Sequence, residues 1–342
     1  MREEISIYEA AKSPWSVLAR SFLKDLDVTL GEVDSNPRII QRAEQRLLQS
    51  LNPKAGREQK SDDPYVEFTS FFVAKALVDG IGSMFLRRRW ATAEAKRAEL
   101  FFLQESEARL VQLAQREFQW KISAKITQVG GRVFTHKLHF SDYLKAATVF
   151  HEKEWKLVNK RLINGYVLLR KSETARVLRA ALEKMLERDI KKISANFPPN
   201  IQRVYDTFAE KVQKTADRYR REIQGEIAPD AFPPCMKVLL AKLEEGKPLS
   251  HIARFAITAF LLNIGMDADS ILELFMKAPD FREDFARYQI EHIAGKRGST
   301  AYTSPSCAYM ISVRLCVEPD KAETRRHPLA YYRRRRKWSS KP

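Results

Sequence analysis

The segment Ile223-Gln-Gly-Glu-Ile-Ala-Pro-Asp-Ala-Phe-Pro-Pro234 decides how this chain is organised. Gly225, Pro229 and the pair Pro233-Pro234 oppose a continuous helix, because glycine lowers helix propensity and proline removes a backbone donor. All three cysteines of the chain lie beyond this segment. We therefore predict two domains, one over 1–226 and one over 231–332, which agrees with the usual domain sizes for a chain of 342 residues.

The first domain is predicted to be mostly helical. Apolar residues recur at helical spacing over 36–51, where Pro37 suits the first turn of a helix. The region 65–120 is rich in helix-forming residues and indicates two or three further helices.

A small α+β subdomain is predicted within the first domain, at about 121–195. The sequence alternates with period two on both sides of Gly130-Gly131, which is typical of a β-hairpin. Its second strand places Phe134, His136, Leu138 and Phe140 on one face. A short apolar run at 165–169 suits a third strand, and helical spacing returns over 172–193.

The second domain is predicted to be helical. Ser250 is expected to cap one helix and Asp267 or Asp269 the next, since short polar side chains satisfy the free backbone N–H groups at helix starts. The Asp267-Ala-Asp269 pair also has the composition of a two-metal polymerase site, but its place at a helix start favours capping. Residues 333–342 are expected to form a basic tail.

The charge of the chain points to a polyanionic partner. Lys and Arg number 60 against 43 Asp and Glu, so the net charge is +17, and nucleic acid is the first candidate. The longest apolar stretch, 255–264, is far shorter than the roughly 20 residues that span a bilayer. We expect a soluble intracellular protein, nucleoid-associated in the cytoplasm, that has no membrane partner and keeps its cysteines reduced.

The cysteines form the clearest chemical pattern. Cys235 follows Pro-Pro and Cys307 follows Ser-Pro-Ser, so both are expected at helix starts, where the helix dipole favours a thiolate. Cys316 lies nine residues after Cys307. Such thiols suit a soft metal or an iron–sulfur cluster, and they equally suit buried small residues.

Ten motifs, taken in order, carry a family resemblance. In the first domain they are Glu94-Ala-Lys-Arg-Ala98, Asp142-Tyr-Leu144, Trp155-Lys-Leu-Val-Asn159 and Gly165-Tyr-Val-Leu168. In the second they are Pro233-Pro-Cys-Met-Lys237, Leu249-Ser-His-Ile-Ala-Arg-Phe255, Ala278-Pro-Asp-Phe281, Tyr288-Gln-Ile-Glu-His-Ile-Ala-Gly-Lys-Arg-Gly298, Tyr302-Thr-Ser-Pro-Ser-Cys307 and His327-Pro-Leu-Ala-Tyr-Tyr332. The chain resembles the large subunit of archaeal and eukaryotic-type DNA primase over most of its length, with the second set similar to that family's C-terminal iron–sulfur domain.

The resemblance implies a regulatory, non-catalytic subunit whose first domain binds the small catalytic primase subunit. It also implies a [4Fe–4S] cluster on four cysteines, of which Cys235, Cys307 and Cys316 match three. The fourth is absent, and Asp320, Glu323 and His327 are the candidate replacements in the stretch where it is expected. Three outcomes are open: a cluster with an oxygen or imidazole ligand, a three-iron cluster, or a domain without metal.

The resemblance assigns contacts with nucleotide and nucleic acid as well. His251 and Arg254 match the positions that contact the 5′-triphosphate of the initiating nucleotide or primer, and an Arg near a helix N-terminus suits phosphate. The matched segment that follows supplies aromatic and basic residues for single-stranded DNA template and RNA/DNA primer. Its candidate residues are Tyr288, His292, Lys296 and Arg297.

Two other functions remain open on the sequence. One is a stand-alone basic nucleic-acid-binding protein with a zinc-bound or metal-free Cys domain. The other is a helical DNA-repair enzyme of photolyase type, whose helical domain is similar to the primase iron–sulfur domain. Co-purification with a catalytic partner distinguishes the primase subunit from the first, and bound flavin would favour the second.

Overall fold

The computed structural model describes residues 5–51, 61–150, 152–189, 196–223, 226–278, 281–297, 301–319 and 327–339. Contacts within the chain divide it into two compact units, 1–212 and 213–342. The division falls inside helix α10 (Pro199–Ile223), and the Gly- and Pro-rich segment of the predicted boundary begins where α10 ends.

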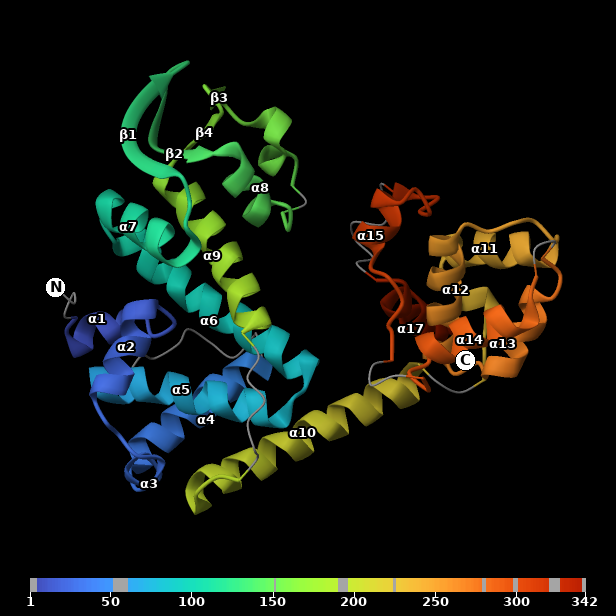
Figure 1. Ribbon diagram of the computed structural model, residues 1–342, viewed down its shortest axis with the longest axis horizontal. Coiled ribbons are helices and arrows are strands. Elements are labelled where there is room, and N and C mark those ends of the chain that lie inside the picture. Colours follow the sequence, from blue (N-terminus) through green and yellow to red (C-terminus); the bar gives the residue numbers. More distant parts are fainter. Residues whose placement is uncertain are drawn as a thin grey trace. The chain divides into compact units, whose positions relative to one another are not determined.

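The described residues up to 118 form seven helices of the first unit (Figure 1). They are α1 (Ile7–Lys12), α2 (Val17–Asp25), α3 (Leu30–Asp34), α4 (Pro37–Leu51), α5 (Pro64–Ile81), α6 (Met84–Gln104) and α7 (Glu107–Phe118). Local signals in the sequence set their ends. Asp63 accepts a hydrogen bond from the Tyr65 N–H (3.0 Å) in front of Pro64, and Gly82 ends α5 with φ 66°. The helices predicted over 36–51 and 65–120 are confirmed.

A sheet and its covering helices follow in the first unit, which ends with the first half of α10. The elements are β1 (Ile122–Val129), β2 (Arg132–His139), α8 (Phe140–Ala147), the 3-10 turns η1 (Lys153–Trp155) and η2 (Leu157–Asn159), β3 (Leu162–Ile163), β4 (Tyr166–Leu169) and α9 (Lys171–Arg188). The four strands are antiparallel in the order β1-β2-β4-β3. The hairpin register pairs Val129 with Arg132 across Gly130 and Gly131, whose φ angles of 57° and 74° favour glycine.

Two details of the sheet differ from the prediction. Strand β3 was not expected, because two residues are too short to show a period. Phe140 does not continue the buried face of Phe134, His136 and Leu138: it begins α8 and is 39% exposed. His139 ends the strand by capping α8, since its Nδ1 faces the Ser141 N–H.

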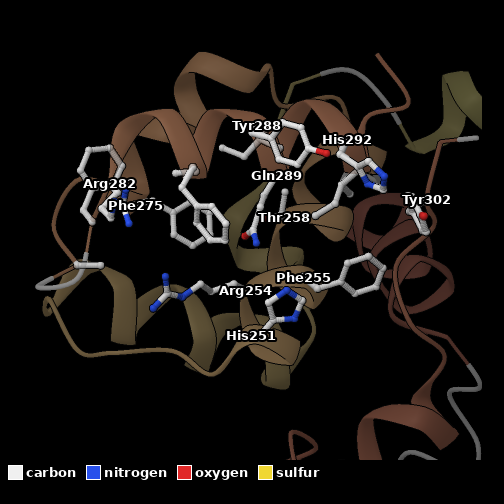
Figure 2. A pocket seen from close by; sticks show the side chains of 16 residues that line it. His251, Arg254, Phe255, Thr258, Phe275, Arg282, Tyr288, Gln289, His292 and Tyr302 are labelled. Atoms are coloured by element: carbon white, nitrogen blue, oxygen red, sulfur yellow. The ribbon is translucent and has the colours of Figure 1, made fainter. Parts of the chain in front are cut away.

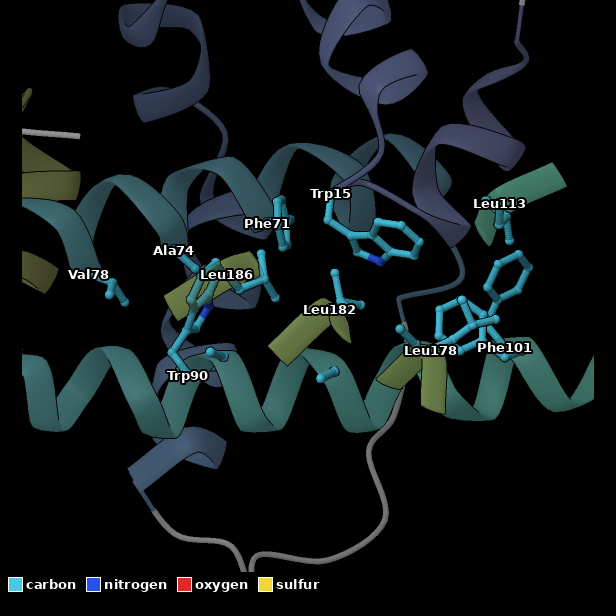
Figure 3. Close-up of a cluster of buried hydrophobic side chains, with 14 of the residues drawn as sticks. Trp15, Phe71, Ala74, Val78, Trp90, Phe101, Leu113, Leu178, Leu182 and Leu186 are labelled. Atoms are coloured by element: carbon cyan, nitrogen blue, oxygen red, sulfur yellow. The ribbon is translucent and has the colours of Figure 1, made fainter. Parts of the chain in front are cut away.

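Buried aromatic and aliphatic side chains form the core of the first unit (Figure 3). Helix α6 packs against α9 and against α4, and α4 packs against α5. Trp90 lies 1% exposed on α6, and its ring centroid is 5.5 Å from that of Phe71. Leu178, Leu182 and Leu186 recur along α9 at helical spacing and face this core.

A charge network is buried in the same core. The guanidinium of Arg46, 1% exposed, donates to Glu94 (2.8 Å) and to Glu67 (2.5 Å), and Arg42 donates to Glu67 (2.8 Å). Arg97 pairs with Glu94 from one turn further along α6. Burial raises the pKa of Glu94 and outweighs the attraction of Arg46, which lowers it. The motif Glu94-Ala-Lys-Arg is therefore explained by packing in this unit.

The second unit consists of short helices (Figure 1). They are η3 (Pro229–Ala231), α11 (Pro234–Glu244), α12 (His251–Ile264), α13 (Ala268–Phe275), α14 (Glu283–Ile293), α15 (Cys307–Ser312) and α17 (Pro328–Ser339). Phe232, Phe260 and Tyr332 pack edge to face at centroid distances of 5.2 to 5.8 Å. The Tyr332 hydroxyl accepts from the Ala228 N–H (3.1 Å), so the C-terminal helix is tied to the segment that precedes Cys235.

The basic C-terminal segment differs from the free tail that we expected from residue 333. Helix α17 continues to Ser339. Arg336 stacks over the Tyr332 ring (5.8 Å) and donates to the main-chain oxygen of Ile223 (2.7 Å), so this basic side chain has partners within the folded unit.

No helix within the described residues is long and apolar enough to cross a membrane.

Candidate nucleotide and nucleic-acid site

The start of α12 presents two of the predicted binding residues. Ser250 caps the helix by accepting from the Ala253 N–H (3.3 Å), as expected. His251 is exposed in the first turn. Arg254 is half-buried, and its Nε donates to the main-chain oxygen of Leu249 (3.0 Å). The guanidinium is thereby oriented by the backbone that leads into the helix.

Helix α14 presents an aromatic stack. Tyr288 and His292 lie one turn apart with centroids at 6.2 Å, and His292 stacks on Tyr302 at 5.5 Å. The Arg297 guanidinium lies over the Tyr288 ring at 5.3 Å and pairs with Glu291. The first ring of the stack therefore faces a guanidinium whose charge is partly offset by the carboxylate of Glu291.

Asn263 fixes the extended segment that brings Tyr302 to this stack. Its amide nitrogen donates to the Tyr302 oxygen (3.2 Å), and its amide oxygen accepts from the Ser304 N–H (2.9 Å). The Tyr302 N–H donates to Ile293 at the end of α14 (2.9 Å). The polar residue that interrupts the apolar run of α12 thus positions the third ring of the stack.

The side chains of five of these residues line one cavity of about 330 Å³ between α12 and α14: His251, Arg254, Tyr288, His292 and Tyr302. Figure 2 shows Phe275 and Arg282 at one end, His292 and Tyr302 at the other, and Arg254, Thr258 and Gln289 between them. Two arginines and two histidines belong to the lining, and none of the described lining residues is acidic. The electrostatics of the cavity therefore suit an anion.

The structure brings four of the six predicted binding residues together. His251, Arg254, Tyr288 and His292 all line the cavity. Lys296 and Arg297 follow α14 and are exposed outside the lining.

Tyr302 and Gln289 also line the cavity, although the sequence motifs that contain them suggested no role for either residue. Gln289 follows Tyr288 in its motif, and Tyr302 begins the motif that contains Ser304-Pro-Ser306. Membership in these motifs was the only sequence feature that could have pointed to a role for either residue.

The three cysteines meet at a second, much smaller cavity. Cys235 lies in the first turn of α11, Cys307 begins α15, and Cys316 follows it; all three thiols are free of disulfides. They line a space of about 20 Å³, close to the volume of one water. Within the described residues, no three Cys, His, Asp or Glu side chains are arranged closely enough to hold a metal ion.

The protonation of Cys235 differs from the prediction that its place near a helix start favours a thiolate. Burial raises the pKa of this thiol to about 11, and the neighbouring Cys307 and Cys316 contribute to the rise. Burial and like charge therefore outweigh the helix dipole at this position.

Of the three candidates for a fourth ligand, only His327 lies within the described residues. Asp320 and Glu323 lie outside the described residues. His327 accepts from the Leu329 N–H through Nδ1 (3.2 Å) at the start of α17, and it is absent from the residues that line the cysteine cavity. Glu318, which the sequence pattern did not single out, does line it.

The Asp267-Ala-Asp269 pair has structural partners. Asp267 caps α13 by accepting from the Ser270 N–H (2.9 Å), as expected, and Asp269 pairs with Arg287 (2.7 Å).

Three further histidines of the first unit had no predicted role. His136 is buried in the sheet and His139 caps α8, while His151 lies outside the described residues.

The chain is similar to known proteins over nearly its whole length. Residues 225–333 match the family described as the C-terminal domain of the large subunit of eukaryotic and archaeal DNA primase. The DNA primase large subunit PriL of Methanocella arvoryzae is 35% identical, over 95% of this chain and 87% of the relative. The PriL proteins of Methanococcoides burtonii and Halobacterium salinarum are 34% and 32% identical, over 86% and 94% of this chain and 82% and 92% of the relatives. The motifs, the helical fold and these matches agree, and the chain belongs to the family of archaeal and eukaryotic DNA primase large subunits.

Proposed function

We propose that this protein is the non-catalytic subunit of a two-subunit primase, and that its second unit positions the initiating nucleotide and the template. The first unit binds and stabilises the small catalytic subunit in this proposal. The observation that carries it is the cavity between α12 and α14, where Arg254 and His251 face a lining without described acidic residues. The capping role of Asp267 and the pairing of Asp269 support a subunit that leaves nucleotidyl transfer to its partner.

Arg254 is the residue that we assign to the triphosphate. Its guanidinium lies in the first turn of α12, where backbone N–H groups and the helix dipole also attract phosphate. The hydrogen bond from Nε to Leu249 fixes the orientation of the guanidinium plane. A planar guanidinium in this position forms paired hydrogen bonds with phosphate oxygens, which an ammonium group does not.

The stack of Tyr288, His292 and Tyr302 is assigned to single-stranded template. Tyr288 is 49% exposed and Tyr302 39%, so the ring faces and edges are open to a base. Stacking on aromatic rings tolerates any base, while Lys296 and Arg297 beside the stack neutralise backbone phosphates. Such a surface binds a template strand without selecting its sequence.

Binding of the triphosphate by Arg254 and of the template by the aromatic stack together explain how the subunit would contribute to initiation. Primer synthesis starts by joining two nucleotides. Holding the first nucleotide beside the template makes their reaction effectively unimolecular and so raises its rate. The residues that bind here act only on the 5′ end. Their contribution is therefore largest for the first bond and smaller for extension of a primer.

We assign the three cysteines to an iron–sulfur cluster, which requires their side chains to move apart, since they line only about 20 Å³ here and the described residues include no group of three side chains that could hold a metal ion. Three thiols from separate segments line one cavity, and thiolate is the donor that such clusters prefer. When bound, the cluster would link the starts of α11 and α15 to the segment of Cys316, and its ligands would be deprotonated. Because the fourth cysteine is absent from the sequence, a four-iron cluster would take an oxygen or imidazole donor from 318–327, whereas a three-iron cluster would take none.

Replacing Arg254 tests the proposed function. In the complex with the catalytic subunit, Arg254→Ala is expected to lower the rate of dinucleotide synthesis at least about tenfold, because a charge-assisted contact is lost. Extension of a preformed primer should fall less than about twofold. Arg287→Ala, which removes a half-buried arginine on α14 outside the cavity lining, is the matched control. Equal loss of initiation and extension in Arg254→Ala would contradict the proposal.

Co-expression of the full chain with the catalytic subunit tests whether the two proteins form a complex. We expect one stoichiometric complex in gel filtration. A full chain that binds DNA and elutes alone would instead support a stand-alone nucleic-acid-binding protein.

A further inference from the structure

The positive charge of the first unit is concentrated in one part of its sequence. Residues 1–120 hold 18 Lys and Arg and 18 Asp and Glu, whereas residues 121–171 hold 11 Lys and Arg and three Asp and Glu. We call 121–171 the basic segment. It contains the four strands, α8, η1 and η2, and Figure 1 shows the strands and α8 together at one end of the first unit. It carries +8 of the net charge of +17, so it attracts anions far more strongly than the neutral part that precedes it.

Six exposed cations of the basic segment have no acidic partner among the described residues. They are Lys121, Lys125, Arg132, Lys153, Lys156 and Arg161. Two of the three acidic groups of the segment are engaged with other cations, since Asp142 pairs with Lys145 (2.8 Å) and Glu152 pairs with Arg176. The positive charge of these six side chains is therefore directed to solvent.

The six cations form two groups. The hairpin group is Lys121, Lys125 and Arg132, on β1 and β2, and the β3 group is Lys153, Lys156 and Arg161, on the chain that leads into β3. Strands β1 and β3 are the two terminal strands of the sheet. Neighbouring strands lie about 4.8 Å apart, so these edges are separated by about 14 Å. Over about 14 Å a nucleic-acid duplex presents about eight backbone charges.

We infer that the basic segment binds the phosphate backbone of a nucleic-acid duplex, as a second contact besides the candidate site of the second unit. This contact goes beyond the proposed function, which assigns the first unit to the catalytic subunit alone, and it does not depend on the role of Arg254. Four of the six cations are lysines, which are depleted in protein–protein interfaces. Exposed Lys and Arg are the groups that neutralise backbone phosphates.

The basic segment suits a duplex better than a single strand. Proteins that bind single strands stack the bases on exposed aromatic rings. Among the described residues of the basic segment, Phe140 is the one large aromatic side chain that is exposed, while Tyr143 and Trp155 are buried. A duplex keeps its bases stacked and offers its phosphates outside. The contact therefore holds a duplex without reading its sequence.

Duplex binding by the full-length protein tests this inference. The probe is a DNA duplex of about 20 base pairs with 5′-hydroxyl ends, so that no triphosphate contributes to binding. Two triple variants replace the hairpin group (Lys121→Gln, Lys125→Gln, Arg132→Gln) and the β3 group (Lys153→Gln, Lys156→Gln, Arg161→Gln). The matched control, Lys24→Gln with Arg88→Gln and Lys96→Gln, also removes two exposed lysines and one exposed arginine of the first unit. Circular dichroism checks that all three variants are folded.

Each triple variant should bind the duplex at least about tenfold more weakly than the wild-type protein does. The slope of the logarithm of affinity against the logarithm of salt concentration should become shallower by about 2 to 3, because each phosphate contact contributes about 0.9. The control should change the affinity less than about twofold. An effect of either triple variant no larger than that of the control would overturn the inference.

Two further results would assign the basic segment to another partner and also overturn the inference. One is a loss of affinity for a single strand of the same length that is as large as the loss for the duplex. The other is unchanged duplex binding together with weaker binding of the catalytic subunit, which would show that the six cations face an acidic protein surface.

Discussion

The guanidinium of Arg336 donates a hydrogen bond of 2.7 Å to the main-chain oxygen of Ile223, the last residue of α10. The C-terminal helix α17 thereby caps the end of the helix that contains the division between the two units. A cation is favourable at this place, because the last carbonyl groups of a helix have no partners within the helix and carry partial negative charge.

Arg336→Ala is expected to lower the free energy of unfolding of the protein by about 1–2 kcal/mol, since it removes a charge-assisted cap and the stacking on Tyr332. Urea unfolding followed by circular dichroism measures this. Arg334→Ala, an exposed residue of the same helix, should change the free energy by less than about 0.5 kcal/mol. An equal effect of the two variants would show that Arg336 does not act as a cap.

Disrupting the buried charge network around Arg46 is expected to lower the free energy of unfolding more than Arg336→Ala does. Arg46→Met leaves Glu67 and Glu94 facing each other without their shared cation, and breaking a buried pair from one side costs about 3–5 kcal/mol of stability. Arg38→Met removes an arginine whose side chain is 64% exposed beside Asp63, and should cost less than about 1 kcal/mol. Similar stability of the two variants in urea titrations would contradict a structural role for the network.

The pH dependence of stability is predicted from His136. Its ring is 0% exposed, with Nε2 3.1 Å from Glu107. Burial lowers the pKa of His136 and outweighs the charge of Glu107, which raises it, while Lys171 lowers it further. The unfolded chain therefore binds a proton at His136 below a pH of about 6.5 that the folded chain does not bind.

Stability should accordingly fall as the pH is lowered from 7 to 5.5, and His136→Gln should reduce this slope. The measurement is the urea midpoint at each pH. His251→Gln removes an exposed histidine and should leave the slope unchanged. A slope that His136→Gln does not alter would assign the acid sensitivity to other groups.

The cysteine assignment is tested by the iron and acid-labile sulfide content of anaerobically purified protein. We expect a brown protein with about four irons per chain, whose colour is lost in Cys235→Ser. Variants at Glu318, Asp320, Glu323 and His327 then identify any fourth ligand by the absorption spectrum. A colourless, folded protein without iron would mean that the three cysteines are packed core residues.

Much of the fold follows from local sequence signals. The Gly130-Gly131 turn with period-two flanks specifies the hairpin, and Ser250 and Asp267 specify helix starts, because each signal acts through backbone groups within a few residues. Strand β3 has a local partner that its two-residue length concealed: Ile163 pairs with Tyr166 across Asn164-Gly165, whose φ angles of 49° and 78° suit a two-residue hairpin turn. The extension of α17 depends on a distant partner, since Ile223 accepts from Arg336 and no local pattern contains that contact.

The residues of the candidate site could be predicted only where they lie close together in one segment of the sequence. His251 and Arg254 lie on a single helix turn, so their spacing showed that they share a face. The cavity combines Phe275 of α13 with residues of α14, which only the packing of α13 against α14 brings together. For Cys235 the helix start was predicted correctly, but the burial that raises its pKa depends on tertiary structure.

The central claim is that Arg254 binds the 5′-triphosphate of the initiating nucleotide, and the affinity for a primer–template duplex tests it most directly. The purified protein is titrated with duplexes that differ only in a 5′-triphosphate or a 5′-hydroxyl on the primer. We expect at least about tenfold tighter binding of the triphosphate, abolished in Arg254→Ala and retained in Arg287→Ala. Equal affinity of the wild-type protein for both duplexes would contradict the claim.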